Sequence, residues 1–156
     1  MDYQQIIRSQ YLATLEMLKQ AIEKCPAAVW NDPADKNKFW HVAYHALFYT
    51  HFYLQPTEKD FRPWPKYHDL HDLSQTADPC SQEDLLEYLA FCQQQVTEQV
   101  PQLNLDAESG FYWLPFNKAE LQIYNIRHLQ QHAGELMERL GSRAGLEVDW
   151  VGLKYE

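Results

Sequence analysis

The helical character of the chain is indicated most strongly by the stretch Trp40-His41-Val42-Ala43-Tyr44-His45-Ala46-Leu47-Phe48-Tyr49. A helix built from this stretch carries aromatic and apolar side chains on nearly all sides, which is typical of a helix buried on most of its surface. We predict that this helix covers about residues 35–54, with Pro56 as its stop. Such a helix requires partner helices that cover it.

Three further helices follow from apolar residues at helical spacing and from end signals. Asp2, Ser81 and Asn117 are the predicted N-caps, and Gly141 is predicted to close the last helix. The predicted ranges are about 2–24, 81–100 and 117–141, followed by an irregular tail over 142–156.

The connection over residues 55–79 is too long for a simple turn between two neighbouring helices. It allows a crossover, whereas the link between the first two helices is short enough for them to pack as antiparallel neighbours. We therefore predict one all-α domain over residues 1–156, a four-helix bundle whose topology is not simply up-and-down.

Composition excludes several classes of function. The chain has 13 basic and 22 acidic residues, a formal net charge of −9, which disfavours nucleic acid as a partner. No apolar stretch approaches the length of a membrane span, and residues 1–20 lack the apolar core of a secretory signal. Three cysteines without CxxC spacing suggest neither a disulfide framework nor a cysteine metal site, so we expect a cytoplasmic protein.

Four of the seven histidines form two pairs at i, i+4 spacing, His41 with His45 and His128 with His132. Residues at this spacing lie about 40° apart around a helix, so two imidazoles can reach one metal ion. Facing helices of a bundle build such sites, and the candidate ligand sets are His45, His128 and His132, or all four histidines. Glu135 follows one turn later as a ligand, a partner of a ligand or a general base. Leu129 after His128 excludes an HExxH protease motif.

At these residues the sequence resembles the DinB-like (DinB/YfiT) metalloprotein family. The resemblance rests on two helical runs, Val42-Ala43-Tyr44-His45-Ala46-Leu47-Phe48-Tyr49-Thr50 and Ile126-Arg127-His128-Leu129-Gln130-Gln131-His132-Ala133-Gly134. It implies a crossed-over four-helix bundle, often dimeric, in which His45, His128 and His132 bind a divalent ion, nickel or zinc.

The resemblance also implies a function. Characterised branches of the family include transferases and isomerases that use low-molecular-weight thiols. We expect a metal-dependent enzyme acting on a small molecule, a thiol S-transferase or a hydrolase-like enzyme, in which Glu135 or a tyrosine handles protons. The alternative is a non-catalytic metal-binding protein or a dimeric scaffold with a role in stress response.

Other conspicuous residues receive simpler interpretations. His51 points about 120° away from His45 and is expected at the surface or an interface, while His68 and His71 are expected in a solvated loop. The aromatic residues of two loops are expected to cover the pocket, and three tyrosines are expected to pack in the core. These are Trp64, Phe111, Tyr112 and Trp113 in the loops, and Tyr44, Tyr49 and Tyr124 in the helices.

Overall fold

The computed structural model describes residues 1–156, and its regular structure is helical, with one isolated β-bridge between Glu108 and Asn117. The all-α fold class is therefore confirmed. The four long helices are α1 (Tyr3–Lys24), α3 (Phe39–Tyr53), α4 (Gln82–Gln99) and α5 (Lys118–Ala144). The shorter turns are α2 (Ala27–Trp30), η1 (Glu58–Asp60) and η2 (Val100–Gln102).

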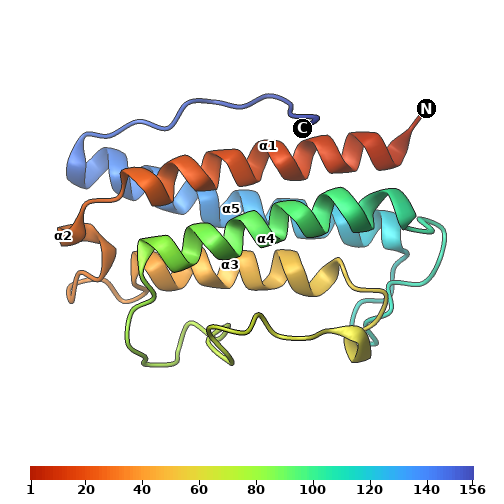
Figure 1. Ribbon diagram of the computed structural model, residues 1–156, viewed down its shortest axis with the longest axis horizontal. Coiled ribbons are helices and arrows are strands. Elements are labelled where there is room, and N and C mark those ends of the chain that lie inside the picture. Colours follow the sequence, from red (N-terminus) through yellow and green to blue (C-terminus); the bar gives the residue numbers. More distant parts are fainter.

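The long helices lie along a common axis, and each packs against two of the other three (Figure 1). Both α1 and α3 pack against α4 and α5, so that α1 and α3 lie diagonally across the bundle. The expectation that the first two helices are neighbours is wrong, because α4 and α5 lie between them. Figure 1 shows α3 and α4 running in the same direction, with residues 54–81 returning along the bundle to join them.

Three of the four long helices, α1, α4 and α5, start at a residue whose side chain caps the helix. The side chain of Asp2 accepts a hydrogen bond from the backbone N–H of Gln5, and that of Ser81 accepts one from Asp84. Asn117 does the same for Glu120 at the start of α5. Each cap satisfies one of the backbone donors that a helix leaves unpaired in its first turn.

Two predicted boundaries are wrong. The second long helix begins at Phe39 rather than near Asp35, because the Asp35 carboxylate pairs with Arg139 and Arg143 instead of capping a helix. Helix α5 continues through Gly141 and ends at Ala144. Gly145, with φ 64°, adopts the left-handed conformation that closes the helix.

A single large core fills the space between the helices, and Trp40, Tyr11 and Tyr88 are among its fully buried side chains. All three cysteines are free thiols inside this structure. No helix of the bundle combines the length and the apolar character that crossing a membrane requires.

Candidate metal centre

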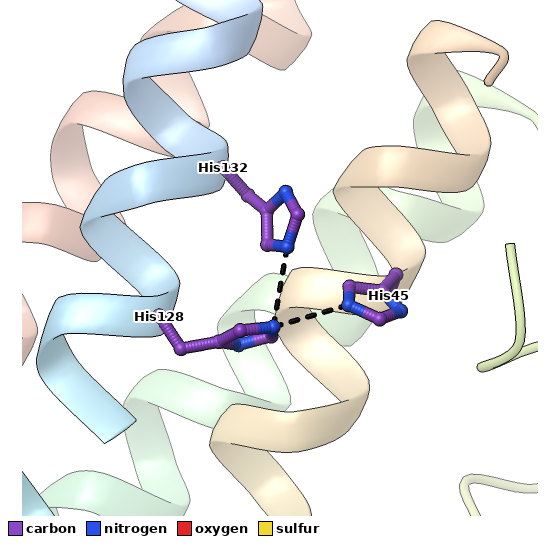
Figure 2. A group of neighbouring side chains, drawn as sticks. All are labelled: His45, His128 and His132. Atoms are coloured by element: carbon purple, nitrogen blue, oxygen red, sulfur yellow. Dashed lines mark hydrogen bonds between the residues drawn. The ribbon is translucent and has the colours of Figure 1, made fainter. Parts of the chain in front are cut away.

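Three histidines converge between α3 and α5. His45 comes from α3, and His128 and His132 come from successive turns of α5 (Figure 2). The Nε2 atom of His128 lies 3.1 Å from that of His45 and 3.2 Å from that of His132. The candidate ligand nitrogens of the three residues all lie within 4.8 Å of one another.

These separations suit a shared cation. With zinc–nitrogen distances of 2.0–2.1 Å and tetrahedral angles, two ligand nitrogens lie about 3.3–3.4 Å apart. The two shortest separations in the cluster are close to that value. The three residues therefore fit a cation site with three nitrogen ligands.

Hydrogen bonds on the far side of two rings fix which nitrogen faces the cluster. His45 Nδ1 donates to the backbone carbonyl of His71 at 2.5 Å. His132 Nδ1 donates to Oε2 of Glu135 at 3.0 Å. In a neutral imidazole the proton on Nδ1 leaves a lone pair on Nε2, so both rings direct a metal-binding lone pair inward.

His128 completes the cluster without such a partner. Its Nδ1 is buried and makes no hydrogen bond. A proton on its Nε2 can be donated to only one of the two neighbouring Nε2 atoms at a time, so hydrogen bonding alone leaves the cluster incompletely satisfied. Buried polar groups are normally satisfied, and a cation that accepts all three lone pairs satisfies the three Nε2 atoms together, with the proton of the His128 ring then on Nδ1.

Burial keeps the rings of His45 and His128 neutral. Desolvation lowers the pKa of His45 to about 4, although the hydrogen bond to the His71 carbonyl opposes this shift. Desolvation also lowers the pKa of His128 to about 4, with smaller contributions from the neighbouring imidazoles. Since only the neutral ring can bind a metal, both side chains are ready to do so near pH 7.

Tyr49 borders the cluster on the α3 side. Its ring centroid lies 5.0 Å from that of His45 and 5.3 Å from that of His128, with edge-to-face geometry in both cases. Its half-buried hydroxyl has a raised pKa, caused mainly by desolvation, and is therefore protonated near neutral pH. Tyr53, stacked on Tyr49, and Tyr124 beyond it continue this row of rings.

The other tyrosine and the loop aromatic residues are placed differently. Tyr44 is buried and donates to the Tyr67 carbonyl, as expected of a core tyrosine. Trp64 does not cover the histidines; it is buried and stacks on Tyr88 at 4.6 Å.

The aromatic residues 111–113 also cover little of the histidine rings. Phe111 is buried against Phe52 and Tyr53, whereas Tyr112 is 89% exposed. Trp113 stacks on Phe52 rather than on a histidine.

His41 does not join the cluster. Its ring stacks on Trp40, and its Nε2 donates to the Leu70 carbonyl at 2.7 Å. The four-histidine set is therefore not assembled in this structure. His41 and His45 instead hold adjacent carbonyls of the long connection, those of Leu70 and His71.

The remaining histidines differ from one another. His51 is 3% exposed and packs among Phe61, Tyr88 and Phe91, so its expected surface location is wrong. It does point away from the cluster, but that side of α3 is covered by α4 and the long connection.

The two histidines of the long connection differ in their exposure to solvent. His68 is exposed, whereas His71 is half-buried, and its ring stacks on Phe48 at 4.5 Å. Sequence reasoning missed the contact between His71 and His45, because a backbone carbonyl has no signature in the sequence.

Glu135 lies on the Nδ1 side of the His132 ring, opposite the nitrogen that faces His128. It is therefore placed as a partner of a candidate ligand and not among the converging nitrogens. Its other carboxylate oxygen lies 3.5 Å from Nη2 of Arg139. No spacing rule predicted this second contact.

Comparison with known proteins identifies the family of the chain. The family model described as the DinB superfamily matches residues 10–136, a segment that contains all three converging histidines. No curated protein gives a significant match to the chain, and no solved structure does either. Because the family model covers well over half of the sequence, the chain belongs to the DinB superfamily.

Proposed function

We propose that His45, His128 and His132 bind one divalent ion, nickel or zinc, and that the protein is a metal-dependent enzyme acting on a small molecule. The observation that carries this proposal is the convergence of three Nε2 atoms, two of them with their Nδ1 protons held elsewhere. Membership in the DinB superfamily supports it.

A bound divalent ion supplies Lewis acidity, which lowers the pKa of a water or thiol ligand toward neutrality. The residues of the chain supply the rest of the site. His45 and His128 stay neutral, and the His71 carbonyl and Glu135 orient two of the rings. The ring of Tyr49, which carries a protonated hydroxyl, packs against His45 and His128.

The proposed reaction is transfer of a low-molecular-weight thiol to an electrophilic small molecule. The thiol gives up its proton, its sulfur forms a bond to the electrophilic carbon, and the bond from that carbon to the leaving group breaks. The leaving group takes up one proton, so the thiol and the electrophile give a thioether and the protonated leaving group. Tyr49 is a candidate donor, because its ring packs against two of the three histidines. Glu135 faces away from the converging nitrogens, which favours a role in orienting His132 over a role in proton transfer.

Metal titration tests the site first. The metal-free protein should bind zinc or nickel at a ratio of one ion per chain, with a Kd below the micromolar range in a chelator competition assay. Absence of binding at micromolar metal would contradict the metal site. The His132→Ala variant should bind at least about 100-fold more weakly, because loss of a ligand costs more than the roughly 10–100-fold typical of an outer partner.

Activity is tested with a panel of thiols and model electrophiles. Thiol consumption should depend on added metal and should fall to the uncatalysed rate in His132→Ala, while the exposed His68→Ala variant serves as control. Tight metal binding with no turnover of any pair would instead support the non-catalytic alternative, a metal-binding or scaffold protein.

We also propose that the protein is a cytoplasmic homodimer. An apolar groove of about 500 Å³, the α1/α5 groove, is lined by side chains that include Tyr3, Ile6 and Ile123, which are about half exposed. The net charge of −9 makes two copies repel each other over much of their surface. This groove carries one acidic and one basic residue, Asp106 and Arg127, so a second copy can meet it with opposite charges paired.

A further inference from the structure

The ion pairs around Arg139 connect the candidate metal centre to the entrance of α3. Nη2 of Arg139 lies 3.5 Å from Oε1 of Glu135, whose other oxygen accepts the hydrogen bond from His132. Nη1 donates to the backbone carbonyl of Asn37 at 2.9 Å and to the Asp35 carboxylate at 3.3 Å. One guanidinium therefore contacts a partner of the metal centre and two residues of the segment that leads into α3.

We propose that Arg139 is a positioning residue of the metal centre, which acts through Glu135 to fix the ring of His132. This inference rests on the proposed metal site. Asp35 and the Asn37 carbonyl hold the guanidinium of Arg139 in place, and the guanidinium in turn limits the movement of the Glu135 carboxylate. Because that carboxylate accepts the hydrogen bond from Nδ1 of His132, its position fixes the ring of His132.

Burial makes this arrangement specific to arginine. The side chain of Arg139 is 13% exposed and that of Asp35 is 6% exposed, so both charges depend on their partners. The planar guanidinium offers five donors in a fixed fork, whereas a lysine offers one ammonium group on a flexible stem. A lysine at this position keeps the charge but cannot hold Glu135, Asp35 and the Asn37 carbonyl together.

Arg143 provides a matched control. It lies one turn further along α5 and also pairs with Asp35, together with Asp32. Its side chain is 36% exposed, and it contacts neither Glu135 nor a histidine of the cluster. A lysine at Arg143 therefore perturbs the same acidic partner without affecting the orientation of His132.

The experiment compares Arg139→Lys with Arg143→Lys, using zinc affinity from chelator competition and the absorption spectrum of the cobalt-loaded protein. Both substitutions conserve charge, so the electrostatic repulsion of the incoming ion is unchanged. We expect Arg139→Lys to weaken zinc binding about 3- to 10-fold, less than direct loss of an outer partner, and to shift the cobalt bands. Arg143→Lys should leave both unchanged. Thermal denaturation of the metal-free variants measures their stability separately.

A double-mutant cycle tests whether Arg139 acts through Glu135. In a Glu135→Ala background, Arg139→Lys should cause no further loss of zinc affinity, because the carboxylate through which it acts is gone. Equal affinities for Arg139→Lys and Arg143→Lys, or an undiminished effect of Arg139→Lys in the Glu135→Ala background, would overturn the proposal. Failure of the unmodified protein to bind zinc would instead contradict the metal site itself.

Discussion

His128 occupies the middle of the cluster, and its buried Nδ1 has no partner. Replacing His128 by leucine removes a buried Nδ1 that has no partner, which favours folding, and one hydrogen bond to a neighbouring imidazole, which disfavours folding, so the two effects partly cancel. We expect His128→Leu to change the free energy of unfolding of the metal-free protein by less than about 1 kcal/mol. The variant should nevertheless lose the stabilisation by metal, which for the unmodified protein is about 2.7 kcal/mol at 100 times the Kd.

Denaturant unfolding with chelator, and thermal unfolding with and without zinc, measure these two effects. The His68→Leu variant is the control that should keep the metal-dependent rise in Tm, because His68 is exposed and outside the cluster. A loss of several kcal/mol in metal-free His128→Leu would show that this histidine is a structural residue.

His51 is a buried histidine with no place in the metal site. Desolvation among Phe61, Tyr88 and Phe91 lowers its pKa to about 4, below the value near 6.5 of an unfolded chain. Between these values the unfolded state binds more protons, so stability is fully present above pH 6.5 and decreases as the pH falls toward 4. The contribution of His51 lost between pH 7 and pH 5 is about 2 kcal/mol.

Urea denaturation of His51→Phe and the unmodified protein at both pH values, with chelator present, checks this account. The variant should lose less stability on acidification than the unmodified protein, by about that amount. Identical pH dependence of the two proteins would mean that protonating the ring of His51 in the folded state does not lower the free energy of unfolding.

At the scale of the helices, a glycine inside α5 and the glycine that closes this helix should respond in opposite ways to replacement by alanine. Gly134 lies within the helix, and a Cβ added there meets nothing within 4 Å, so Gly134→Ala should stabilise the protein by about 0.5–1 kcal/mol. Gly145 has the same free space but φ +64°, so Gly145→Ala should destabilise it by about 1 kcal/mol. Denaturant midpoints measure both changes, and equal signs for the two would contradict the assigned backbone conformations.

The ends of the helices also show how far local sequence signals extend. Caps such as Asp2 and Asn117 were predictable because they bond to backbone groups three residues away. The start of α3 was not, because Asp35 interacts with residues more than 100 positions later. Gly141 and Gly145 look equivalent as stop signals, and only the conformation of the folded chain distinguishes them.

The metal centre also combines a local signal that the sequence shows with a long-range contact that it does not. The i, i+4 pair on α5 was visible in the sequence because helix geometry alone places His128 and His132 together. His45 and not His41 joins the cluster because of the long connection. The Leu70 carbonyl of that connection binds Nε2 of His41, whereas Nε2 of His45 faces His128 on α5. Spacing could not make that choice, and it left both ligand sets open.

At the scale of the whole molecule, the α1/α5 groove yields a prediction about assembly. Exposed apolar patches of this kind mark interaction sites, and a charge placed in one disfavours burial against a second copy. Light scattering and sedimentation should give the unmodified protein about twice the mass of one chain. Ile123→Glu should shift it to the mass of one chain, while Tyr112→Glu, which does not line the groove, should leave the dimer intact.

A charge exchange tests whether the partner is a second copy in a two-fold arrangement. Arg127→Asp places two acidic residues at the rim of each groove and should weaken the dimer. Adding Asp106→Arg to the same chain restores one acid and one base per groove, so the double variant should dimerise again. Recovery is expected if the two residues meet across a two-fold interface, because each copy then supplies both members of the pair. A double variant that stays monomeric, or an unmodified protein with the mass of one chain, would contradict this assembly.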